Sequence, residues 1–322
     1  MKDEAENKGT PEDREQVFKL LADAVQGHLH IEPAVDEAKV RAIAGEEIER
    51  HQSFAPLAVE VRGTGREPVR VDGAHRQFAE LLALMDEGHR NLMLVGPAGC
   101  GKTTMARQVA HALNLPFGFL SLSAGVTETH LLGRVLPQSD GSWQYQKSLF
   151  VRLYEEGGVF LLDEIDAADA NLLVAVNAAM ANGVLANPVT GTVHERHPDC
   201  YILAAGNTWG MGADVQYVGR NQLDASTRDR FVLAMLTVDY DARLEKAIAH
   251  GSLPDADAAA LIKWVTGLRR RIADNRIRRV ASTRLVANGV MAMKAGRTLE
   301  QVKARYFVDW SRDERAKIGE EE

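Results

Sequence analysis

A glycine-rich stretch constrains the fold of this chain more than any other feature. Residues 96–104 read Gly-Pro-Ala-Gly-Cys-Gly-Lys-Thr-Thr, which matches the pattern G-x-x-x-x-G-K-[ST] of a phosphate-binding loop. The apolar run at 91–95 before it predicts a buried strand, and residues 104–113 after it have helical spacing. Strand, loop and helix in this order favour a phosphate site over a chance glycine-rich turn.

Each residue type in this loop has a chemical role. Glycines let the backbone curl so that several N–H groups point at phosphate oxygens, and the helix start adds the positive end of its dipole. We expect Lys102 to reach the β- and γ-phosphates and the Thr103 hydroxyl to ligate Mg²⁺. The residues expected to hold the nucleotide are Gly96, Pro97, Ala98, Gly99, Cys100, Gly101, Lys102, Thr103 and Thr104.

Two further apolar runs end in polar side chains. Residues 159–162 predict a buried parallel strand, and Asp163 and Glu164 follow at its carboxyl end, the edge of an α/β sheet where ligands bind. We expect Asp163 to hold Mg²⁺ together with Thr103, and Glu164 to orient and deprotonate the attacking water. The run at 201–205 leads to Asn207, which is placed to hydrogen-bond the γ-phosphate or that water.

Length and composition indicate a soluble protein of two domains, or of one domain with an appendage. The chain has 322 residues, of which 45% are hydrophobic and 26% charged, and only two are cysteines. Its first residues are polar and acidic, and no apolar run is long enough to cross a bilayer. We therefore expect a cytoplasmic protein without membrane contact.

The patterning divides the chain into three regions. We expect an acidic helical N-terminal appendage over 1–57, an α/β core over 58–238 and a helical lid with a charged C-terminal tail over 239–322. Within the core, hairpins are expected near 134–146 and 185–198. The aromatic residues Trp143 and Tyr145 of the first hairpin belong either to the core or to an exposed contact.

Charge is unevenly distributed. Residues 1–60 carry 7 Lys/Arg against 14 Asp/Glu, whereas the rest of the chain carries 31 of each. The overall balance does not suit a nucleic-acid-binding protein, but residues 268–284 contain seven arginines and one aspartate. That cluster either contacts nucleic acid or serves ATP, a neighbouring subunit or the acidic N-terminal segment.

The order of these motifs resembles that of AAA+ ATPases. The chain is similar to the MoxR branch and its dynein-related relatives, including the CbbQ/NirQ activases, in five segments. These are the phosphate loop, Leu161-Leu162-Asp163-Glu164, Gly206-Asn207-Thr208, Asp229-Arg230-Phe231 and Ser282-Thr283-Arg284. The stretch 217–224 is similar to phage and bacterial members. The likeness covers roughly residues 70–295. It departs at Cys100, where Thr or Ser is commoner, but only the backbone N–H is needed there.

The resemblance implies a fold, roles and partners. The fold is a P-loop NTPase core of three layers with a five-stranded parallel sheet, followed by a small helical lid and assembled as a hexameric ring. Asn207 would be sensor 1, Arg230 the arginine finger with Arg228 as second candidate, and Arg284 sensor 2. Both hairpins would face a central pore or a protein client, often one with a von Willebrand factor A domain.

The resulting hypothesis is a Mg²⁺-dependent, chaperone-like ATPase that forms a ring and remodels a protein partner. One alternative is a motor or helicase loader stimulated by DNA or RNA, as the arginine cluster suggests. Another is an assembly module in which ATP holds the ring together with almost no turnover.

Overall fold

The centre of the molecule is a parallel five-stranded sheet. The computed structural model describes residues 59–61, 68–188 and 190–320, so the expected appendage over 1–57 lies outside the described residues. The strand order in the sheet is β11-β3-β10-β7-β4, which confirms the parallel sheet implied by the resemblance. Its strands are β3 (Asn91–Val95), β4 (Phe117–Ser121), β7 (Gly158–Asp163), β10 (Cys200–Gly206) and β11 (Met235–Thr237).

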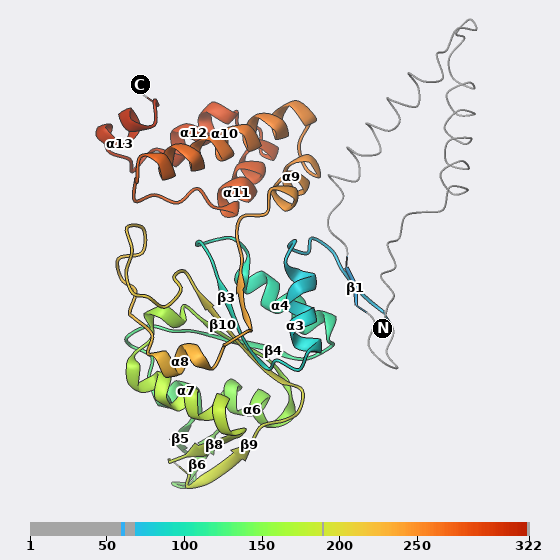
Figure 1. Cartoon of the computed structure of the whole chain (residues 1–322), viewed down its shortest axis with the longest axis vertical. Helices are drawn as coiled ribbons and strands as arrows, with labels where there is room; N and C mark the ends of the chain where they lie inside the picture. The colour runs from blue at the N-terminus through green and yellow to red at the C-terminus, as the bar shows by residue number, and fades with distance from the viewer. Residues whose placement is uncertain (1–58, 62–67, 189, 321–322) are drawn as a thin grey trace, which may run out of the picture. The chain divides into compact units, whose positions relative to one another are not determined.

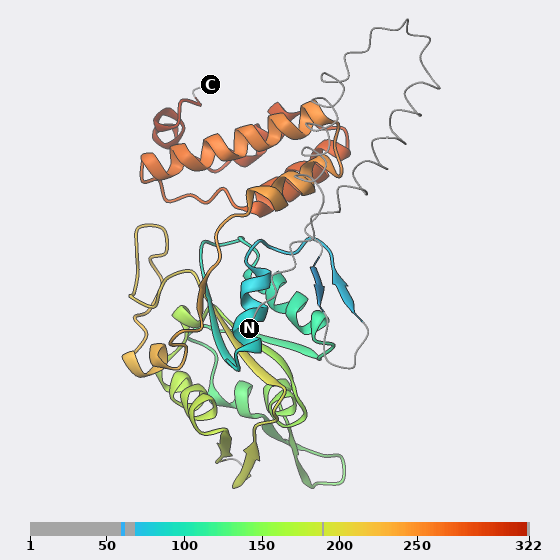
Figure 2. The same ribbon diagram turned by 45° about the vertical axis from the view of Figure 1, so that its right-hand side comes forward.

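Alternating side chains on these strands create two hydrophobic faces. In β10, Ile202 packs into one cluster of buried residues and Leu203 into the other, because successive strand residues point to opposite faces. One face is covered by α3 (Phe78–Asp86) and α4 (Lys102–Ala112), and the other by α6 (Leu149–Glu156) and α7 (Ala170–Asn182). The core therefore has three layers (Figures 1 and 2).

The sheet brings the chemically informative segments to one edge. Strands β3, β10 and β7 are neighbours, with Gly206 paired to Val95 and Leu203 paired to Leu161. All three run in the same direction, so their carboxyl ends meet. The phosphate loop follows β3, Asp163 is the last residue of β7, and Asn207 follows β10. They therefore lie together although they are far apart in sequence.

A second hydrophobic core lies within the C-terminal helices. These helices are α9 (Ala242–His250), α10 (Asp255–Asp274), α11 (Thr283–Lys294), α12 (Leu299–Tyr306) and α13 (Arg312–Lys317). Among these helices, four aromatic rings pack mostly edge to face, with centroids 5.1–6.2 Å apart: Trp264, Tyr306, Phe307 and Trp310. We refer to residues 239–320 as the lid.

The C-terminal segment, expected as a charged tail, contains one further helix. Helix α13 follows a capping box in which Ser311 and Glu314 satisfy each other's backbone N–H groups. The apolar residues that dock this segment, Trp310 and Ile318, are both buried but flank the helix. Because these apolar residues lie outside α13, the sequence of the helix itself shows no helical spacing of hydrophobic residues.

Two antiparallel hairpins extend the core. Strands β5 (Arg134–Pro137) and β6 (Trp143–Gln146) form one, and β8 (Val184–Asn187) and β9 (Thr192–Glu195) form the other. Asn187 Nδ2 donates to the Tyr145 hydroxyl over 2.8 Å, so the two hairpins touch. The Tyr145 side chain is half-buried, whereas Trp143 is 70% exposed, and only Trp143 is available for an external contact.

Candidate active site

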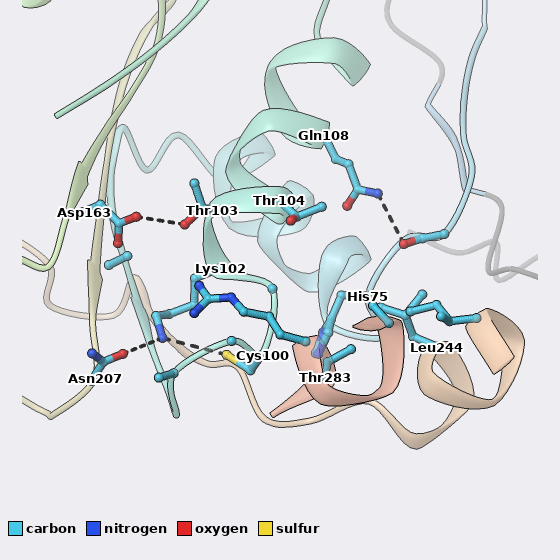
Figure 3. A pocket seen from close by; sticks show the side chains of 18 of the residues that line it. His75, Cys100, Lys102, Thr103, Thr104, Gln108, Asp163, Asn207, Leu244 and Thr283 are labelled. Atoms are coloured by element: carbon cyan, nitrogen blue, oxygen red, sulfur yellow. Dashed lines mark hydrogen bonds between the residues drawn. The ribbon is translucent and has the colours of Figure 1, made fainter. Parts of the chain in front are cut away.

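A cavity of about 400 Å³ lies at the carboxyl edge of the sheet. The phosphate loop, the end of β7, Asn207 and the lid all contribute to its wall (Figure 3). One part of the cavity wall consists of backbone and mostly apolar side chains, from Gly73, His75, Leu244, Ile248 and Ala287. The polar side chains of the lining include Lys102, Thr103, Asp163, Glu164, Asn207 and Arg284.

The phosphate loop has the backbone conformation that an anion cradle needs. Gly99 and Gly101 have φ angles of 73° and 108°, in the left-handed region that favours glycine. A Cβ atom on Gly96 would lie 1.9 Å from the carbonyl oxygen of Val238, so the first glycine permits a close approach of the chain after β11. The curled loop at the start of α4 fits a nucleotide phosphate.

Lys102 is buried within this loop. Its Nζ donates to the carbonyl oxygens of Gly96 (2.6 Å) and Pro97 (3.0 Å) and to Asn207 Oδ1 (3.0 Å). Burial lowers the pKa of the Lys102 ammonium, and the nearby carboxylates of Asp163 and Asp166 oppose that shift. The structure thus joins Lys102 to Asn207, two predicted site residues that are 105 positions apart.

Two side-chain oxygen atoms that suit a magnesium ion face each other beside the phosphate loop. The Thr103 hydroxyl donates to Asp163 Oδ2 over 2.8 Å (Figure 3). Hydroxyl and carboxylate oxygens are ligands that Mg²⁺ prefers, so this pair fits the ion. Glu164 follows with a φ of 57°, a strained conformation of the kind that concentrates at functional sites.

The lid closes the cavity through the start of α11. A Cβ atom on Gly99 would lie 2.7 Å from the Ser282 side chain, so the lid rests directly on the phosphate loop. The buried carboxylate of Glu245 accepts from the Thr283 hydroxyl (2.7 Å) and from Arg269 (2.8 Å). These bonds fix the turn that places Arg284 in the cavity wall.

Sequence reasoning missed four side chains that support this site. Asp166 is fully buried and accepts from Arg220. The hydroxyl of Tyr217 accepts the N–H of Ala98 over 2.8 Å, and the hydroxyl of Tyr240 donates to the carbonyl of Ala98 over 3.1 Å. The sequence signals were weak: a third carboxylate shortly after Asp163–Glu164, and a polar stretch at 217–224 that was noted only for its resemblance.

The structure does not bring Arg228 and Arg230 into the cavity. They lie at the end of the short helix α8 (Ala225–Asp229), and neither lines the nucleotide pocket. Both side chains are half-buried, and the buried Nε of each lacks a hydrogen-bond partner. Among the described residues, no ion pair is made by either guanidinium.

Three of the seven arginines at 268–284 form ion pairs inside the lid. Arg269 pairs with Glu245, Arg271 pairs with Glu320, and Arg279 pairs with both Asp309 and Glu314. These ion pairs neutralise much of the local positive charge. They join α10 to α9, and they join α10 and the segment before α11 to the chain around α13. Part of the excess of arginine in this stretch therefore has a structural explanation.

Comparisons with known proteins agree with this geometry. Residues 91–231 match the family described as AAA domain (dynein-related subfamily). The chain is 31% identical over 199 residues to the denitrification regulatory protein NirQ of Pseudomonas aeruginosa, covering 61% of this chain and 73% of that protein. The chain belongs to the MoxR-like AAA+ ATPases.

Other comparisons extend the picture. NirQ of Stutzerimonas stutzeri is 29% identical over 211 residues, covering 65% of this ATPase and 74% of that protein. A solved structure from Cytophaga hutchinsonii covers 73% of this chain and 68% of its own at 15% identity, with a TM-score of 0.43, a likeness too weak to add to the assignment. No helix in the described part of this ATPase is long and apolar enough to span a membrane.

Proposed function

We propose that this ATPase assembles into a ring, hydrolyses ATP with Mg²⁺, and uses the cycle to remodel a protein partner. Lys102 contacts the β- and γ-phosphates, and Thr103 and Asp163 hold Mg²⁺, which neutralises phosphate charge when it is bound. Glu164 takes a proton from the water that attacks the γ-phosphorus. The bond to the β,γ-bridging oxygen then breaks, and ADP and phosphate leave.

The observation that carries the ring is the position of Arg228 and Arg230. Both side chains are half-buried, the buried Nε of each has no hydrogen-bond partner among the described residues, and neither side chain lines the nucleotide cavity. Developing charge on a transferred phosphoryl group is stabilised by an added arginine, which a second protein copy can supply. We assign this role to Arg230, with Arg228 as the second candidate, and we assign the sensor positions to Asn207 and Arg284.

A mixing experiment tests the supply of Arg230 between copies. Glu164→Gln binds ATP but has no base, and Arg230→Ala has an intact pocket but no finger. Mixed at equal concentration, these two inactive variants regain turnover, because Arg230 of the first serves the pocket of the second. Activity of the mixture no higher than that of the separate variants refutes the ring mechanism. Arg228→Ala in place of Arg230→Ala identifies the finger.

A control separates this effect from a general loss of positive charge. Arg270 lies in the arginine cluster, is exposed, and forms no ion pair or hydrogen bond within the described chain. Arg270→Ala has the turnover of the unmodified ATPase at every concentration. The rate per subunit of the unmodified ATPase rises with concentration as rings form, and a flat rate per subunit contradicts assembly.

A protein client is preferred to nucleic acid because three arginines of the cluster, Arg269, Arg271 and Arg279, are paired with carboxylates of the lid. Single- and double-stranded DNA added at low salt are expected to leave the ATPase rate unchanged. An ATPase rate that increases when DNA is added favours the alternative function, a motor stimulated by nucleic acid. The exposed Trp143 on the β5–β6 hairpin is the side chain we expect to reach the client.

A further inference from the structure

The carboxylate of Asp166 is fully buried and does not line the nucleotide cavity. Its Oδ2 accepts from the N–H groups of Asn207 (3.0 Å) and Thr208 (2.9 Å) and from the Thr208 hydroxyl (2.9 Å). These bonds fix the backbone at the point where β10 ends. They therefore also fix the direction in which Asn207 presents its amide to Lys102.

The second oxygen of Asp166 holds an arginine. Arg220 Nη1 donates to Asp166 Oδ1 over 3.1 Å, and Arg220 Nη2 lies 3.5 Å from Glu164 Oε1. The Arg220 side chain is 14% exposed, so its planar guanidinium is fixed between the two carboxylates. Asn221 secures the same segment, because its N–H donates to the backbone carbonyl of Asp166 over 2.6 Å.

Glu164 depends on this arginine for its position. Its side chain is 46% exposed, and within the described chain it makes no side-chain hydrogen bond and forms an ion pair only with Arg220. An unrestrained glutamate samples many rotamers. Proton transfer requires the carboxylate to stay within hydrogen-bond reach of one water, so a fixed cation beside Glu164 raises the fraction of time spent there.

We propose that Asp166 and Arg220 form a positioning pair for ATP hydrolysis. Arg220 holds the carboxylate of Glu164, and Asp166 holds both Arg220 and the backbone of Asn207. Neither residue lines the nucleotide cavity. The proposal rests on the proposed role of Glu164 as the base, and it extends the hydrolytic machinery to two residues outside the cavity.

The first test is Arg220→Met, which keeps the length of the side chain and removes its charge. A general base contributes about 10²–10⁴-fold, and displacement by about 1 Å costs up to about 10²-fold. We therefore expect kcat to fall about 10- to 100-fold. The KM for ATP stays unchanged because Arg220 does not line the cavity.

Arg220→Lys is a second variant that keeps the proposal testable if Arg220→Met does not fold. It keeps a cation beside the buried Asp166 but loses the planar fork that spans two carboxylates. We expect melting temperature to be preserved and kcat to lie between those of the unmodified ATPase and Arg220→Met. Unchanged kcat in a folded Arg220→Met protein overturns the proposal. A raised kcat also overturns it, because Arg220 then restrains Glu164 instead of positioning it.

The second test separates positioning from support of the fold. Single-turnover hydrolysis is measured for Glu164→Gln with and without Arg220→Met. If Arg220 acts through Glu164, the second change leaves the residual rate unaltered, whereas a role in the fold slows it by the same factor as in the unmodified background. Arg270→Met is the matched control and leaves all rates unchanged.

The same variants distinguish failure of the proposal from failure of the proposed function. Turnover at the unmodified rate in Glu164→Gln removes the base and therefore the proposed hydrolytic mechanism. An inactive Glu164→Gln together with a fully active Arg220→Met leaves that mechanism intact and rejects only the positioning pair.

Discussion

A methyl group added at Gly99 tests the contact between the phosphate loop and the lid. Gly99 has a φ of 73°, and its missing Cβ would lie 2.7 Å from both Cβ and Oγ of Ser282. The left-handed conformation costs a non-glycine residue about 1–2 kcal/mol. Forcing an atom into a packed site costs a further 1–3 kcal/mol, roughly. Gly99→Ala is therefore expected to lower the free energy of unfolding by about 2–5 kcal/mol.

The part of the destabilisation that comes from steric overlap disappears when the Ser282 side chain is removed. Ser282 precedes α11 but makes no side-chain capping bond, so Ser282→Gly alone costs only a few tenths of a kcal/mol, roughly. In the double variant, about 1–3 kcal/mol is regained as favourable coupling between the two positions. Urea denaturation of the four proteins of this cycle, followed by circular dichroism, measures the coupling.

Gly101 provides the matched control. Its φ is 108°, so Gly101→Ala carries conformational strain, but no atom lies within 4 Å of its added Cβ. Gly101→Ala is therefore expected to destabilise the protein without coupling to Ser282→Gly. Strictly additive effects of Gly99→Ala and Ser282→Gly would refute the close approach of the lid to the loop.

Three further predictions concern charge and hydrogen bonding. Lys102→Met removes a charge-assisted contact of about 1.5–3 kcal/mol, so affinity for a fluorescent ATP analogue falls about 10- to 100-fold, and unchanged affinity contradicts its role. Tyr217→Phe leaves the N–H of Ala98 without its acceptor and weakens the same affinity by a factor of about 10, whereas equal affinities assign the tyrosine to packing alone. The hydrogen bond from Arg279 lowers the pKa of Glu314 from 4.5 to about 2, so the pair stabilises the fold above pH 4.5 and stops doing so as the pH falls to about 2. Unfolding of Glu314→Gln against the unmodified protein shows this as a difference that is constant above pH 4.5 and shrinks below it, and a difference that grows on acidification contradicts the assignment.

The parts of the site that could be predicted from the sequence are those whose chemistry is local. The phosphate loop needs glycines, a lysine and a hydroxyl in consecutive positions, and Asp163 and Glu164 directly follow an apolar strand. Parallel strands of one sheet end at the same edge, so the proximity of Asn207 to Lys102 followed from the α/β pattern.

The parts that could not be predicted depend on long-range pairing. Asp166 and Arg220 are 54 residues apart, and nothing near either residue indicates that the other neutralises it. The arginines of the lid appeared to form a basic surface for the same reason. Arg279 meets its partners only once α13 folds back, so charge counted along the sequence overstated the charge left for a ligand.

The N–H and the carbonyl of Ala98 are both hydrogen-bonded to tyrosine hydroxyls, and these bonds link the position of the lid to the binding of nucleotide. Tyr217 accepts its N–H, and Tyr240, which lies under the Arg269 guanidinium at 3.8 Å, donates to its carbonyl. Burial raises the pKa of Tyr240, so this donor keeps its proton at neutral pH. One neutral hydrogen bond contributes about 0.5–1.5 kcal/mol. The loss of this bond in a lid rotation therefore couples to nucleotide affinity by at most about 2- to 12-fold, and by thermodynamic reciprocity bound nucleotide biases the lid by the same factor.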